Sequence, residues 1–373
     1  MEEILNLMAW CGSSSMGTSL LAGTLGKKED ELLEQIKEAV TAGSLKEAGK
    51  KGRYEITPET RKERRDNFPL EDKKEWVTDI CRRLGDWFDE RRKDSNIQPA
   101  YEAEMDHLKE WAGHVKPYSI FHAARLTWLQ AYPPYFRGEY EEALKQVQAA
   151  QSLLDSAPET ETGTEEAVRL KANLFHDLAA VYDELNHADE ALKNYRLALE
   201  LQEKHFGRQH EDTAETISNI AAAYDRMGNR EEAITYFEEA LEIRRQLFGE
   251  EHAETASSIN NIGTSYYEAK RYTDAVQYLE KAVEIRTKVL GHEHPDTADS
   301  LYNLGICLVN IKKLKTAYER VNPFVKKLSP DHPNYNELVG LLAFIDKESV
   351  KSGFRPMSSV SSKKKKKKKK KKR

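Results

Sequence analysis

The sequence predicts an all-α protein built from stacked pairs of helices, and three observations carry this prediction. Identical residues return at a fixed step of 42 positions, apolar residues within each unit follow helical spacing, and alanine recurs where two helices would meet closely. Such a period is typical of repeats that bury their apolar faces only by stacking on their neighbours. The recurring sets are Gly207, Gly249 and Gly291; His210, His252 and His294; Thr213, Thr255 and Thr297; Asn219, Asn261 and Asn303; and Ala191, Ala233, Ala275 and Ala317.

The unit at residues 207–248 illustrates how each element is expected to form. Thr213 is expected to cap a first helix, which Gly228 and Asn229 bring to an end. A second helix is expected from about residue 230 to 248, where Gly249 stops it. The apolar stripes are Ile217, Ile220, Ala221 and Tyr224 on the first helix, and Ala233, Ile234, Phe237, Ala240, Leu241 and Ile243 on the second.

Composition points to an acidic intracellular chain. Of its 58 basic residues, eleven fill positions 363–373, and the remaining 47 face 63 acidic residues, a net charge of −16 that makes nucleic acid a poor partner. The three cysteines are far apart and odd in number, which fits buried thiols in a reducing compartment. No signal-peptide pattern opens the sequence, and no apolar run approaches the ~20 residues that span a bilayer. We therefore expect a cytoplasmic protein with no membrane partner.

Four segments follow from these patterns. Residues 1–66 form a compact mixed module, residues 67–116 a charged helical linker, and residues 117–350 the repeats with a C-terminal capping helix. Residues 351–373 form a Ser/Lys-rich tail that is expected to be disordered. The run from Lys363 to Arg373 would favour nuclear import or phosphate binding, although an idle tail or an artefact is the preferred interpretation.

The repeat resembles the tetratricopeptide repeat. The resemblance is carried by the series Leu178, Ala179, Tyr182, Ala191, Tyr195, Ala198. It recurs with similar residues as Ile220, Ala221, Tyr224, Ala233, Phe237, Ala240 and as Ile262, Gly263, Tyr266, Ala275, Leu279, Ala282. Each unit exceeds the usual 34 residues because its second helix extends through Glu-Ile-Arg to a Phe-Gly or Leu-Gly end, as in the repeats of kinesin light chain. The resemblance implies an α-solenoid that binds a protein or peptide ligand in the concave groove of its repeats.

The N-terminal module is expected to contain two helices followed by a hairpin, with a turn at residues 49–52 and a strand at residues 53–56. This order reads as a winged helix and resembles the segment that precedes the repeats in STAND-type signal-transduction NTPases. Tyr54, Ile56, Pro58 and Arg61 match the end of the wing, and residues 103–112 match the helix leading into the repeats. The resemblance implies an NTPase domain upstream or in trans, and no such domain is present in the sequence.

No catalytic, metal or cofactor site is expected, so we expect no enzyme. Residues 12–19 imitate a P-loop, but Thr18 stands where the phosphate-binding lysine belongs. The histidines recur one helix pair apart, too far to share a metal ion, so a structural role at each inter-repeat turn is expected. The basic residues of the wing favour docking on an acidic surface over DNA binding; they are Lys46, Lys50, Lys51, Arg53, Arg61, Lys62, Arg64 and Arg65.

The candidate binding residues lie on the first helix of each repeat, which lines the concave groove. The column Asn219, Asn261 and Asn303 is expected to pair with the backbone of an extended peptide, a use of asparagine that the tetratricopeptide resemblance also implies. The alternative is a bond from each asparagine to a neighbouring helix end. Asp177 interrupts the column in the first clear repeat. The flanking positions Ser218, Asn260, Tyr302, Ala222, Thr264, Ile306, Asp225 and Arg226 are expected to set specificity, with a mild preference for basic peptides.

Three functions remain open at this point. The first is a non-enzymatic recognition module, the sensor half of a STAND-type regulator. The second is a stand-alone adaptor similar to kinesin light chain that joins a partner or cargo to other machinery. The third, a winged-helix DNA-binding regulator, has less in its favour because the body is acidic.

Overall fold

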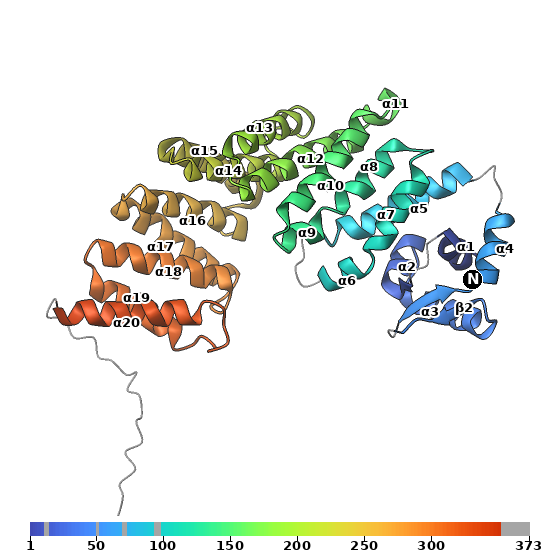
Figure 1. Cartoon of the computed structure of the whole chain (residues 1–373). Coiled ribbons are helices and arrows are strands. Elements are labelled where there is room, and N and C mark those ends of the chain that lie inside the picture. Colours follow the sequence, from blue (N-terminus) through green and yellow to red (C-terminus); the bar gives the residue numbers. More distant parts are fainter. Residues whose placement is uncertain (11–14, 50–51, 69–72, 93–97, 352–373) are drawn as a thin grey trace, which may run out of the picture. The chain divides into compact units, whose positions relative to one another are not determined.

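The computed structural model describes residues 1–10, 15–49, 52–68, 73–92 and 98–351, so the predicted tail falls almost entirely outside the described residues. The chain divides into two compact units, Met1–Gly207 and Arg208 onward, and each is described here by itself. Helices dominate both units, which confirms the all-α repeat fold (Figure 1). Among the described helices, none combines the length and apolar character needed to cross a membrane.

Unit 1 begins with a small helical module around a three-stranded antiparallel sheet of order β1-β3-β2. Two helices followed by a hairpin occur where the sequence predicted them, and β1 adds a strand that the sequence did not predict. The sheet pairs Met16 with Tyr54 and Leu45 with Ile56. The elements are α1 (Glu2–Trp10), β1 (Met16–Gly17), α2 (Thr18–Leu25), α3 (Glu29–Thr41), β2 (Leu45–Glu47), β3 (Arg53–Ile56) and α4 (Pro58–Asp66).

The rest of unit 1 is helical, and one apolar core runs without a break from Ile4 in α1 to Leu178 in α12. The predicted boundaries at residues 66 and 116 therefore lie within a continuous core, and they remain predictions. The helices are α5 (Lys73–Asp89), α6 (Gln98–Ala103), α7 (Met105–Val115), α8 (Ile120–Leu129), α9 (Tyr132–Phe136), α10 (Tyr140–Asp155), α11 (Glu159–Thr162), α12 (Glu165–Glu184) and α13 (Ala188–His205).

A buried ion pair fastens the sheet to these helices. Arg53 of β3 lies 2.5 Å from the carboxylate of Glu104, which is 4% exposed and precedes α7. The backbone N–H of Gly17 donates to the same carboxylate at 3.1 Å. Because a buried charge needs both a partner and hydrogen bonds, this cluster fixes the hairpin against α7.

Unit 2 contains helix pairs stacked in chain order, each packed on the next (Figure 1). Close packing requires small residues at the crossings: a Cβ added to Gly263 would lie 2.7 Å from Cγ of Leu279. The helices are α14 (Glu211–Arg226), α15 (Arg230–Phe248), α16 (Ala253–Glu268), α17 (Tyr272–Val289), α18 (Pro295–Asn310), α19 (Leu314–Val325) and α20 (Tyr335–Lys351).

Histidine caps α14, α16 and α18, the first helices of three successive repeats, and the expectation that Thr213 is the cap was wrong. Nδ1 of His210, His252 and His294 accepts the backbone N–H two residues later, at 3.2 Å in each case. The threonines lie three residues inside the helix, and Thr255 donates instead to the carbonyl of Gly249 at 2.7 Å. The repeated histidines thus have the structural role that their period predicted.

We predict that His252→Ala lowers the free energy of unfolding by about 1 kcal/mol, because α16 loses its N-terminal hydrogen-bond acceptor. His252→Asn should retain most of the stability, since asparagine is a preferred capping residue. Urea unfolding followed by circular dichroism measures both effects. Equal losses in the two variants would show that the stacking of His252 on Phe248, and not capping, stabilises this turn.

Candidate ligand-binding groove

A cavity of about 490 Å³ lies in unit 2 among the first helices of successive repeats. Most of the predicted site residues line it: Ala222, Asp225, Arg226, Asn260, Asn261, Thr264, Tyr302 and Asn303. Sequence reasoning missed the other lining residues, Phe237, Ser265, Arg286, Asp296 and Asp299. Helices α14, α16 and α18 supply most of the wall, and α15 and α17 each add one side chain.

Asn261 and Asn303 hold the same register on α16 and α18, and both side chains border this cavity. Each is half-buried, and neither side-chain amide has a hydrogen-bond partner among the described residues. The alternative expectation, that each asparagine bonds a neighbouring helix end, therefore does not describe these two. Each amide offers two donors and one acceptor to a molecule that enters the cavity.

Three predicted residues are not brought to the cavity. Ser218 is buried and accepts a hydrogen bond from Nη1 of Arg244 at 3.2 Å. Ile306 packs against the apolar core of the unit. Asn219 is half-buried and has an interaction partner of its own.

The missed residue with the strongest electrostatic character is Arg286. It is 6% exposed, and its guanidinium donates to the carbonyl of Asp296 at 2.8 Å and to the hydroxyl of Ser300 at 2.8 Å. Burial lowers the pKa of this guanidinium. The sequence signal was the Glu-Ile-Arg triplet, which recurs 42 residues apart but gave no sign that this arginine reaches the groove.

The acidic residues of the cavity already have neighbours. Asp225 forms an ion pair with Arg230 at 3.0 Å, and Asp296 lies 3.9 Å from Nδ1 of His294. Asp299 accepts a hydrogen bond from the side-chain amide of Asn334. Burial and the nearby Asp296 raise the pKa of Asp299.

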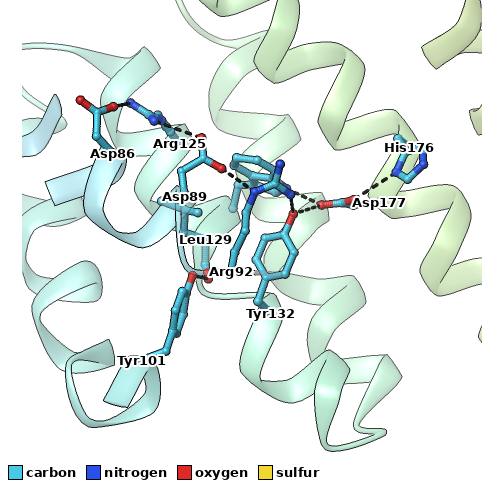
Figure 2. A network of polar contacts seen from close by, with 10 residues as sticks. Asp86, Asp89, Arg92, Tyr101, Arg125, Leu129, Tyr132, His176 and Asp177 are labelled. Carbon is cyan, nitrogen blue, oxygen red and sulfur yellow. Dashed lines mark hydrogen bonds and ion pairs between the residues drawn. The ribbon is translucent and has the colours of Figure 1, made fainter. Parts of the chain in front are cut away.

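Asp177 in unit 1 holds the register of the asparagine column, and its carboxylate is engaged by other helices (Figure 2). Its Oδ2 atom accepts hydrogen bonds from the indole of Trp128 and the hydroxyl of Tyr132, both at 2.7 Å. Tyr132 accepts in turn from Arg92, which also pairs with Asp89. This network joins α12 to α5, α8 and α9, which explains why the column is interrupted here.

The network also sets the protonation state of Asp177. Burial opposes ionisation, but the hydrogen bond and charge of His176, followed by the charge of Arg92, outweigh it and hold the pKa of Asp177 below its usual value. Beside this carboxylate lies a mainly apolar cavity of about 290 Å³, bordered by residues that include Tyr135, Phe136 and Val147.

The other motifs noted in the sequence are the P-loop imitation, the metal-ligating residue types and the basic residues of the N-terminal module. Part of the P-loop imitation, with Cys11, lies outside the described residues; within the rest, the N–H of Gly17 is bound by Glu104 and that of Thr18 by Gly52. No His, Cys, Asp and Glu grouping suited to a metal ion occurs within the described parts. Lys50 and Lys51 also lie outside them, whereas Lys46, Arg53 and Arg64 form ion pairs with Glu55, Glu104 and Glu2.

Residues 170–320 match the tetratricopeptide repeat model in three overlapping stretches, 170–246, 212–288 and 254–320, so this part of the chain consists of tetratricopeptide repeats. The apo form of the quorum sensor NprR from B. thuringiensis has a similar fold, with 16% identity, a TM-score of 0.58 and coverage of 88% of this chain and 78% of NprR. NprR is also known in complex with its cognate peptide NprX.

Two further solved structures are similar to the chain. A STAND protein with a tetratricopeptide repeat sensor from Pyrococcus horikoshii shares 14% identity at a TM-score of 0.53; the match covers 93% of this chain but 60% of that protein. A putative kinesin light chain from Podosopora anserina shares 20% identity at a TM-score of 0.45, covering 60% of this chain and 95% of that one. No curated protein matches the sequence.

We predict that Asp177→Asn lowers the free energy of unfolding by about 2 kcal/mol near neutral pH, because Trp128, Tyr132 and Arg92 lose an ionised acceptor. The folded-state pKa of Asp177 is depressed, so its contribution is present above the unfolded value near 4 and is lost as the pH falls further. Denaturant titrations at pH 7 and pH 3 should therefore show a large difference between wild type and variant at pH 7 and a smaller one at pH 3. An equal difference at both pH values would contradict the charge argument.

Proposed function

We propose that this protein is a non-enzymatic recognition module that binds an extended peptide segment of a partner protein in the cavity of unit 2. The observation that carries the proposal is the pair Asn261 and Asn303, whose amides border one cavity with no partner among the described residues. A peptide backbone offers alternating donors and acceptors, which a side-chain amide can satisfy at both of its ends.

The spacing of the two asparagines suits an extended chain. They lie on α16 and α18, which contact one another. Packed helices lie about 8–10 Å apart, and an extended peptide advances about 3.3 Å per residue. The two amides would therefore meet backbone groups about three residues apart. Variable neighbours such as Thr264 and Tyr302 would then read the side chains between them.

The comparisons agree with a peptide-binding role. NprR, whose fold is similar, binds the peptide NprX. The likeness to the STAND protein extends over the N-terminal module as well as the repeats, and that protein carries its repeats as a sensor. We therefore favour a sensor role, with an NTPase domain in the same chain or in trans, over the adaptor role. DNA binding has no specific observation in its favour, because several basic residues of the module are paired with acidic ones.

The proposal predicts that Asn261→Ala combined with Asn303→Ala weakens peptide binding about tenfold or more, because each side chain loses hydrogen bonds to the peptide. The probe is a set of dodecapeptides selected from a random phage-displayed library on the wild-type full-length chain, with affinity measured by fluorescence anisotropy. Circular dichroism should show unchanged helicity in the double variant.

Asn219→Ala is the matched control, because Asn219 has the same register but does not border the cavity. It should leave the affinity of the selected peptides within about twofold. If the double variant binds as well as wild type, or if the library yields no peptide, the groove is not the binding site proposed.

A further inference from the structure

Within the described parts of the chain, Arg286 is a buried cation that forms no ion pair with a carboxylate. Its guanidinium donates to the carbonyl of Asp296, the hydroxyl of Ser300 and, at 3.1 Å, the hydroxyl of Ser257. No carboxylate forms an ion pair with it among the described residues, and its Nε–H has no acceptor there. Burial lowers its pKa, and the negative charges of Asp296, Asp299 and Glu254 oppose that shift from beyond ion-pair distance. A guanidinium carries five N–H donors, so two of them are left unused.

The preceding repeat shows what is missing. Arg244 holds the same register as Arg286, donates to Ser218 and Ser258, and forms an ion pair with Glu254 at 3.4 Å. Its Nε–H also has no acceptor among the described residues, so the ion pair is what distinguishes the two arginines. Glu254 is the second residue of α16, and the residue at that position of α18 is Asp296. Aspartate is one methylene shorter, and its carboxylate does not reach ion-pair distance from Arg286.

Arg286 also differs from Arg244 in its surroundings, because it lines the cavity of unit 2 and Arg244 does not. A second buried donor borders the same cavity: Ser265 is 1% exposed, and its hydroxyl has no partner among the described residues. Burying a charge without an ion-pair partner is unfavourable in general. The wall of the cavity therefore contains two buried donor groups, Nε–H of Arg286 and the hydroxyl of Ser265, that bind no acceptor among the described residues.

We propose that the peptide ligand places a carboxylate against Arg286, where it takes the place that Glu254 holds beside Arg244. This inference rests on the proposed function and adds the chemical class of the ligand: a segment that carries an aspartate or glutamate side chain, or a free C-terminus. It revises the mild preference for basic peptides that the sequence predicted.

The acidic residues of the cavity restrict which ligands can bind, but none of them occupies the position proposed for the ligand carboxylate. Asp225 is paired with Arg230, and Asp299 is bound by Asn334. Asp296 lies near His294 and retains a negative charge close to the proposed position. A second ligand carboxylate would meet these acidic groups, so one anionic group beside Arg286 is favoured and a run of acidic residues is not.

The first experiment supplies the missing acid from within the protein. Asp296→Glu gives α18 the residue that α16 has, so the new carboxylate should pair with Arg286 and occupy the ligand's position. We expect a higher thermal midpoint and an affinity for the selected peptides that is lower by about tenfold. An unchanged midpoint with unchanged affinity would overturn the proposal.

The second experiment changes the ligand and the arginine. Selected dodecapeptides are resynthesised with each Asp or Glu changed to Asn or Gln, and separately with an amidated C-terminus. One of these changes should weaken binding to wild type by about tenfold to a hundredfold, and which one does so distinguishes the side-chain source from the terminal source. Arg286→Met should bind all versions with the same reduced affinity.

Arg244→Met is the control, because it removes the equivalent arginine one repeat earlier, outside the cavity. It should lower stability without changing the preference for the carboxylate. Peptides enriched in Lys or Arg, or neutralised peptides that bind wild type unchanged, would overturn the carboxylate proposal while the groove proposal stands. Failure of the Asn261 and Asn303 variant to weaken binding would instead remove the groove proposal itself.

Discussion

The repeats of unit 2 depend on a buried hydrogen-bonded contact between the second helix of one repeat and the first helix of the next. Arg244 of α15 reaches Ser258 of α16, and Arg286 of α17 reaches Ser300 of α18. Each guanidinium is almost fully buried, so the neighbouring helix must supply its acceptors. The guanidinium of one repeat therefore needs a hydrogen-bond acceptor from the first helix of the next repeat. This requirement favours stacking of the repeats in chain order.

The same constraint determines which positions are open to a ligand. Ser218 holds the register of Asn260 and Tyr302, but it is bound by Arg244 and buried in the interior. Asn260 accepts a hydrogen bond from Ser300 and still borders the cavity, while Tyr302 borders the cavity and packs in part against the apolar core. One register position thus passes from buried to half-buried and cavity-lining as the polar contacts between repeats change.

The period alone was enough to predict the helices of unit 2, because glycine ends and small-residue crossings recur with it. It also placed Asn261 and Asn303 in one register, but it did not show that Asn219 lies away from the cavity. Capping by His210 was not predicted, because threonine is among the usual capping residues and histidine is not. The importance of Arg286 could not be predicted either. It depends on whether an acid two residues into the next helix is long enough to reach a guanidinium, which spacing in sequence does not reveal.

Asp177 shows how one change of residue type removes a position from the groove. An asparagine there would offer both donors and an acceptor, whereas an ionised carboxylate offers acceptors alone. Trp128 and Tyr132 supply matching donors, and Arg92 balances the charge through Tyr132. The carboxylate therefore turns a ligand-facing register position into a structural bond between helices. Asp296 has the opposite effect. It occupies the position that Glu254 holds in the preceding repeat, and because it forms no ion pair with Arg286 among the described residues, this buried arginine is left for an external partner.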